Sequence, residues 1–331
     1  MLSWLAQFFP STPPPQAETT LDLDWNPEIL EGIVAACDLP ALLLLRSVSK
    51  DLKAVVDARL FTHVVRFGRE LHIGPDMGSI SWDKGRPWIE RQAHMVRVVD
   101  DCAGVAYTDF DRARTLRVFR QGERHVLYRN LRTIVYHRPL VESAGGVWAD
   151  IPISIGDEAH YLPKLSKVVV NFIVPYRCTP YGHVHLPRHL KGPMVKFVIF
   201  IIPSASVPDS TGHLPQYRAR TLLFSLGYEV GCVLATHIAF KVALVGTELW
   251  HRTGIAPKPA LKVVDDVDGV EDDGLGQLRN GIRHAFKVMT GHSHAKIERR
   301  WPRGVRFFTV DEYCAKVGDK QFRLEWNPQR S

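Results

Sequence analysis

The sequence predicts an α/β protein in which a small module of three short helices precedes a larger, irregular strand–helix domain. Two observations predict it. Apolar side chains recur at helical spacing over residues 27–61. After residue 66 the sequence instead contains short runs that are rich in residues with a high strand propensity. The chain's 331 residues, 45% of them apolar and 23% charged, are also enough for a small module followed by a domain with a core of its own.

The N-terminal part divides into a leader and a first helix. Ser11–Thr20 is rich in proline, serine and threonine, so residues 1–20 are expected to be a disordered leader. The first helix should begin at Pro27, with Asn26 as its N-cap and Glu28 placed favourably toward the positive end of the helix dipole.

The second and third helices are expected to begin near Pro40 and Ser49. Four consecutive leucines, Leu42 to Leu45, lie on the second helix, where successive residues are about 100° apart. They cannot share one face, and a helix that is apolar all round must be buried all round. Because a unit of about 40 residues is too small to supply a full core, these leucines need another apolar surface, from the same chain or from another protein.

The larger domain, residues 66–331, carries seven β-rich runs and three helical patterns between or after them. The strands are predicted at Met95–Val99, Leu116–Phe119, Leu131–Tyr136, Ser166–Phe172, Val195–Ile202, Phe240–Val245 and Val305–Thr309. The helices are predicted at Gln216–Thr236, Leu275–Met289 and Asp311–Val317. Strands that alternate with helices indicate βαβ-type units and a parallel sheet.

Several of these runs begin with a leucine followed, three residues later, by another apolar residue. Examples begin at Leu116, Leu131 and Leu165. The spacing between them is irregular and the asparagine of a regular repeat is absent, so the pattern fits a degenerate leucine-rich-repeat-like solenoid. An irregular single α/β domain is the alternative.

Residues 21–65 resemble an F-box domain. Three phrases carry the resemblance in the order and spacing of that family: Pro27-Glu28-Ile29-Leu30, then Leu43-x-Leu45-Arg46-x-Val48-Ser49-Lys50, then Arg59-Leu60-Phe61. The sequence departs from the family at Trp25-Asn26, where a leucine usually precedes the proline, and at Leu52, where an aromatic residue is common. The C-terminal stretch from Arg306 to Phe322 is similar to the tail of fungal F-box-like proteins.

The resemblance implies a substrate-recognition subunit of an SCF-type cullin ubiquitin ligase. Its F-box would bind a Skp-family adaptor, which bridges to the cullin, and residues 66–331 would bind a target protein. The docking surface would be formed or supported by Pro27, Ile29, Leu30, Ile33, Leu42, Leu43, Leu45, Val48 and Leu52. Such a subunit needs no catalytic residue, cofactor or metal. The alternative is a stand-alone α/β enzyme with a helical N-terminal cap.

Eight arginines lie within residues 111–138, where only two acidic residues accompany them. They are Arg112, Arg114, Arg117, Arg120, Arg124, Arg129, Arg132 and Arg138. Guanidinium groups bind carboxylate and phosphate with two parallel hydrogen bonds, so the first four are candidates for binding an acidic or phosphorylated target segment. The alternative is that these arginines lie on the solvated faces of neighbouring strands and bind no target. No nucleic-acid-binding motif accompanies them, so a nucleic acid partner is not expected.

Three further clusters do not match the site that each partly resembles. Cys178, His183, His185 and His189 do not have the spacing of a zinc finger. The stretch Gly291–Ala295 departs from the Gly-x-Ser-x-Gly nucleophile elbow and follows a helical pattern instead of a strand. The acidic residues at 265–273 lack the ligand spacing of an EF-hand.

The expected compartment is the cytoplasm, the nucleus or both. The apolar N-terminus has no basic residue before Arg46, which is not the pattern of a signal peptide, and no apolar run is long enough to span a membrane. The five scattered cysteines favour reduced thiols over a disulfide framework.

Overall fold

The computed structural model describes fifteen stretches of the chain. They are residues 27–67, 70–73, 77–81, 90–103, 110–119, 129–137, 140–143, 146–150, 164–174, 182–185, 195–203, 216–236, 241–247, 274–300 and 304–326. The chain divides into two compact units, Met1–Arg59 and Leu60–Ser331, so the boundary falls slightly before the one expected after residue 65. The predicted leader, residues 1–20, lies outside the described residues.

The first unit is built from three short helices, as the sequence predicts. They are α1 (Pro27–Ala36), α2 (Leu39–Val48) and α3 (Lys50–Phe61), the last of which ends in the second unit. The side chain of Asp38 accepts the N–H of Ala41 at 3.0 Å, and that of Ser49 accepts the N–H of Leu52 at 3.1 Å, so α2 and α3 each begin with a capped N-terminus.

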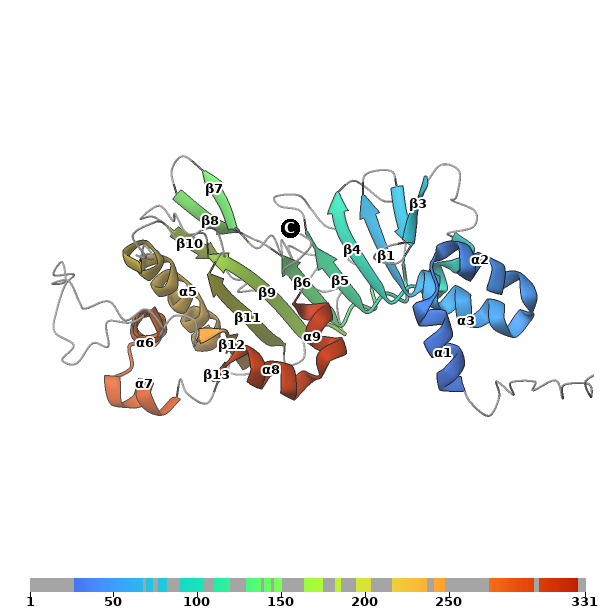
Figure 1. The fold of residues 1–331 in the computed structure, drawn as a ribbon. Coiled ribbons are helices and arrows are strands. Elements are labelled where there is room, and N and C mark those ends of the chain that lie inside the picture. The colour runs from blue at the N-terminus through green and yellow to red at the C-terminus, as the bar shows by residue number, and fades with distance from the viewer. Residues whose placement is uncertain are drawn as a thin grey trace, which may run out of the picture. The chain divides into compact units, whose positions relative to one another are not determined.

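The second unit is organised around a ten-stranded sheet in the order β13-β12-β11-β9-β6-β5-β4-β1-β2-β3, counted over the described residues (Figure 1). Its strands are β1 (His63–Phe67), β2 (Glu70–Ile73), β3 (Met77–Ser81), β4 (Val98–Ala103), β5 (Thr115–Val118), β6 (Thr133–His137), β9 (Lys167–Val174), β11 (Lys196–Pro203), β12 (Lys241–Val245) and β13 (Val305–Phe308). Only β2 pairs antiparallel with its neighbours, β1 and β3. From β1 to β13 every parallel strand of this sheet lies beside the one that precedes it in the chain.

The predicted parallel sheet is therefore confirmed, and each of the seven predicted runs overlaps one of its strands. The strands β1 to β3 were not predicted. Neither was a separate three-stranded sheet of β7 (Leu140–Ser143), β8 (Gly146–Asp150) and β10 (Gly182–His185).

The turns that precede β4, β5, β6 and β9 share one hydrogen-bonding pattern. In each, two successive backbone N–H groups donate to a single carbonyl of the preceding turn, over 2.8–3.0 Å. The accepting carbonyls belong in order to Thr62, Arg97, Arg114 and Arg132. Equivalent residues of these turns therefore lie side by side across the edge of the sheet where the parallel strands begin.

The sheet register shows that one of the three predicted repeat starts, Leu116, is not equivalent to the other two. Leu131 and Leu165, both buried, directly precede two residues of the shared turn pattern, Arg132 and Ser166. Their counterpart before β5 is Ala113, whereas Leu116 pairs with Ile134 inside the sheet. A small buried residue thus takes the place where the sequence pattern favours a leucine.

The two faces of the sheet carry different helices (Figure 1). One face packs with α5 (Gln216–Thr236) and α6 (Gly274–Thr290) into the main core, since residues of both helices share one buried cluster with strand residues. The other face packs with α8 (Val310–Val317) and α9 (Asp319–Glu325), where Tyr313 joins Val169 and Phe200 in a second cluster. The 3-10 helix η1 (Ala93–Met95) and α7 (His294–Arg300) are the remaining elements with bounds within the described residues.

The three predicted helices are confirmed as α5, α6 and α8. Within the described residues, strands and long helices alternate among the later strands: α5 connects β11 to β12, and α6 and α7 lie between β12 and β13. No described helix is long and apolar enough to cross a membrane.

Candidate functional site

The first unit exposes apolar side chains on α1 and α2. Within the described residues eight large hydrophobic side chains are exposed, and five of them lie between residues 29 and 48. They are Ile29 (41% exposed), Ile33 (44%), Leu43 (48%), Leu44 (71%) and Val48 (68%). Ile29 and Ile33, like Leu44 and Val48, are four residues apart, so each pair shares one face of its helix.

Other apolar side chains of the three helices are buried. Leu42 is fully buried, as is Val56 of α3, and Val34 of α1 is nearly so. The guanidinium of Arg46 on α2 donates to the buried carboxylate of Asp57 on α3 at 2.5 Å and makes an ion pair with it. The helices therefore hold together through one side, and the four leucines diverge: Leu42 faces inward, while its two successors face outward.

The predicted docking residues fall into three classes of exposure. Pro27, Ile29, Ile33, Leu43 and Val48 are exposed; Leu30, Leu45 and Leu52 are half-buried; and Leu42 is buried, so it supports the surface without forming it. Leu44, the most exposed large apolar side chain among the described residues, was not among them. Its position four residues before Val48 was the available signal.

The arginines predicted to bind a target are separated by the structure. Arg112 and Arg114 are exposed in the turn before β5. Arg117 lies within β5, is 3% exposed and forms an ion pair with Asp100 of β4, with Nε 3.4 Å from Oδ1. It is therefore not accessible to a target, because its side chain is buried against the neighbouring strand. Arg120 lies outside the described residues, as do Arg124 and Arg138.

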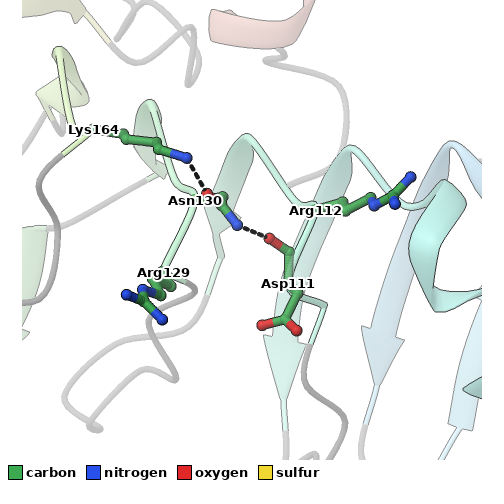
Figure 2. A pocket seen from close by; sticks show the side chains of 5 residues that line it. All are labelled: Asp111, Arg112, Arg129, Asn130 and Lys164. Carbon is green, nitrogen blue, oxygen red and sulfur yellow. Dashed lines mark hydrogen bonds between the residues drawn. The ribbon is translucent and has the colours of Figure 1, made fainter.

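Two other cations join Arg112 at this edge of the sheet. Arg129 from the turn before β6 and Lys164 from the turn before β9 line, with Asp111, Arg112 and Asn130, a hollow of about 450 Å³ (Figure 2). The side-chain N–H of Asn130 donates to the carbonyl of Asp111 at 2.5 Å, and Lys164 Nζ donates to Asn130 Oδ1 at 2.5 Å. Asn130 thus links three successive turns. No pattern in the sequence groups Lys164 with the arginines, because only the sheet register places it beside them.

A polar row crosses the face of the sheet that α8 and α9 partly cover. His63 Nε2 lies 2.9 Å from Asp100 Oδ1, and the guanidinium of Arg117 lies 5.1 Å from the ring centre of Phe119. That ring stacks on His137, with centroids 4.3 Å apart. Asp100, Arg117 and His137 are all buried, and these ion pairs and ring contacts connect side chains of β1, β4, β5 and β6.

The other clusters singled out in the sequence lie partly outside the described residues. Within the described stretches no group of three or more histidine, cysteine, aspartate or glutamate side chains is arranged to hold a metal ion. His183 and His185 lie in β10, whereas Cys178, His189 and the acidic residues at 265–273 lie outside the described residues. Gly291, with a φ of +62°, opens the turn between α6 and α7, so a helix and not a strand precedes Ser293.

Neither the described cysteines nor comparison with known proteins indicates a function for the chain. Cys37, Cys102, Cys232 and Cys314 form no disulfide among themselves. Comparison of the chain with models of protein families, with curated proteins and with solved structures gives no match. Any function therefore has to be inferred from the residues and geometry of this chain.

Proposed function

We propose that the chain is a substrate-recognition subunit of an SCF-type cullin ubiquitin ligase. Its first unit would bind a Skp-family adaptor through α1 and α2, and its second unit would bind the target protein. The observation that carries the proposal is the group of five exposed apolar side chains on two short helices, Ile29, Ile33, Leu43, Leu44 and Val48. Several large apolar side chains exposed on neighbouring helices are typical of a protein–protein interface.

The composition of the first unit supports a docking role. Its buried apolar residues are few, while Leu44 and Val48, two of its most apolar side chains, face outward. Glu28 and Glu31 of α1 are exposed beside Ile29 and Ile33, which gives the apolar face a charged rim of the kind seen around interfaces. The F-box resemblance covers these same helices.

The sheet of the second unit supports a role in target binding. Strands that are added in chain order and joined by equivalent turns are the arrangement of a solenoid, and we assign this part to a degenerate leucine-rich-repeat-like domain. Solenoids present long rows of equivalent positions, which suits them to binding extended protein segments. Ubiquitin transfer would belong to other subunits, so the proposed role requires no catalytic residue in this chain.

The test is a titration of the purified adaptor against the full-length chain and two variants. Leu43→Asp should weaken adaptor binding about a hundredfold or more, because it buries an unpaired carboxylate in the interface. Ala54→Asp introduces the same charge at an exposed position of α3 outside the docking set and should bind as the wild type does. Equal affinity of the Leu43→Asp variant and the wild type would contradict the proposal, as would wild-type protein that does not bind.

A further inference from the structure

The turns before β5, β6 and β9 concentrate positive charge at one edge of the sheet. Five exposed cations lie in them, against one exposed carboxylate, that of Asp111. The cations are Arg112, Arg114, Arg129, Arg132 and Lys164. We call these five residues, with Asn130, the basic edge.

Two of these arginines are neighbours by register. Thr115 pairs with Thr133, and the backbone N–H of Arg132 donates to the carbonyl of Arg114 at 2.8 Å. Adjacent strands are about 4.8 Å apart, so the two side chains start from neighbouring positions. Like charges on neighbouring positions are destabilising. Among the described residues neither guanidinium makes a hydrogen bond or ion pair.

The hollow beside them is partly organised. Asn130 is fixed by its bonds to the Asp111 carbonyl and to Lys164, which holds the lysine ammonium in the wall of the hollow. In Figure 2, Arg112 extends away from Asn130 and Arg129 projects on the other side, so their guanidinium groups lie well apart and flank the tethered pair. Several cations are thus displayed over three adjacent turns, and guanidinium groups bind phosphate or carboxylate with two parallel hydrogen bonds.

We propose that the basic edge binds a short peptide segment that carries closely spaced anionic groups, either phosphorylated serine or threonine or clustered aspartate and glutamate. Three adjacent strands span about 10 Å, and anionic side chains two residues apart in an extended peptide are separated by about 7 Å. Two such groups therefore fit within the edge. The inference rests on the proposed function only in taking this segment to belong to the target.

A nucleic acid fits the same edge less well. Proteins that bind single strands stack bases on exposed aromatic rings, and the one aromatic residue in these described turns, Phe110, is fully buried.

The test measures fluorescence anisotropy of labelled peptide libraries with the full-length chain and no adaptor. Three libraries share randomised flanks and differ at a central pair of residues: two phosphoserines, two glutamates or two serines, separated by one residue. The phosphoserine library, the glutamate library or both should bind, and the serine library should not. Binding should weaken several-fold or more between about 50 and about 200 mM salt, because exposed charge contacts are screened over about 10 Å.

Two charge-matched variants locate the binding. Arg114→Glu with Arg132→Glu should weaken binding about tenfold or more, since it reverses both neighbouring charges. Lys296→Glu with Arg299→Glu makes the same change in net charge on exposed positions of α7 and should leave the affinity unchanged.

These peptide-binding results test the basic edge whether or not the chain binds the adaptor. Absence of binding to both anionic libraries, equal binding by the Arg114/Arg132 variant, or tighter binding of a short single-stranded DNA than of either library would overturn it. Adaptor binding that persists in the Arg114/Arg132 variant would show that the proposed function survives such a failure.

Discussion

The fully buried carboxylate of Glu325 shows how single residues hold the C-terminal helices on the sheet. It accepts a hydrogen bond from the Tyr313 hydroxyl at 2.7 Å and from the Gln321 amide at 2.5 Å, and it pairs with Lys167 of β9. The side chain of Asn171, also from β9, donates to the Glu325 carbonyl at 2.8 Å. A buried charge is stable only with such partners, so these contacts fix α8 and α9 at one position on the sheet.

Tyr313→Phe should lower the free energy of unfolding near pH 8 by about 1–2 kcal/mol, because Glu325 loses a donor. Burial, and to a smaller extent the negative charge of Glu325 and its hydrogen bond, raise the pKa of Tyr313 above its ordinary value of 10. In the folded wild type the hydroxyl therefore keeps its proton above pH 10, while the unfolded chain loses it. The wild type loses the corresponding stability as pH rises, at about 1.4 kcal/mol per pH unit, and the phenylalanine variant does not.

The measurement is urea denaturation of both proteins at pH 8 and at pH 11. The difference between their free energies of unfolding should be clearly smaller at pH 11. A difference that stays constant between the two values would show that Tyr313 does not hold its proton in the folded state.

At the scale of elements, the sequence predicted those segments in which local pattern and position in the fold agree. The runs that became β9 and β11 are largely apolar because both faces of those strands are covered, and α5 was predicted with the bounds that the structure has. In contrast, β2 and β3 were missed, since they are short and lie at the antiparallel edge, where the pattern carries less apolar signal.

The burial of Arg117 could not be predicted from the sequence pattern, because the pattern does not indicate which strands are neighbours. Its partner, Asp100, lies on the neighbouring strand, and the pair forms only when β4 and β5 align in their observed register. An arginine within a strand was therefore expected to be solvated or to bind a target. Arg112 and Arg114, which precede the strand, could be placed on the surface from sequence, whereas Lys164 could join them only through the order of the turns.

The contact between α5 and α6 depends on glycine. A Cβ atom at Gly227 would lie 2.1 Å from the backbone oxygen of Leu278, and one at Gly281 would lie 2.2 Å from that of Phe224. The helix backbones are therefore in direct contact, which only glycine allows at these positions.

Gly227→Ala should lower the free energy of unfolding by about 2 kcal/mol or more, because one helix must move away from the other. Gly32→Ala on α1 is the matched control: nothing lies within 4 Å of the added Cβ, so alanine should be neutral or should stabilise by up to about 1 kcal/mol. Urea denaturation followed by circular dichroism compares them. Equal stability of the Gly227→Ala variant and the wild type would mean that the two helices do not approach this closely.

At the scale of the whole molecule, the two units carry different kinds of surface. The first exposes apolar side chains on α1 and α2, and the second carries the basic edge in its turns. An apolar surface gives stable association by burial, and a charged surface gives binding that salt weakens. This difference fits a subunit with a lasting partner, the adaptor, and a second partner that is exchanged, the target.

Hydrogen–deuterium exchange of the full-length chain, with and without a purified Skp-family adaptor, tests the central proposal most directly. We expect the two proteins to coelute as a complex. Exchange should then slow in peptides from residues 27–48, while α5 and α6 exchange as they do in the free chain. Failure of the proteins to coelute at micromolar concentration would contradict it, as would a complex in which α1 and α2 exchange no more slowly than before.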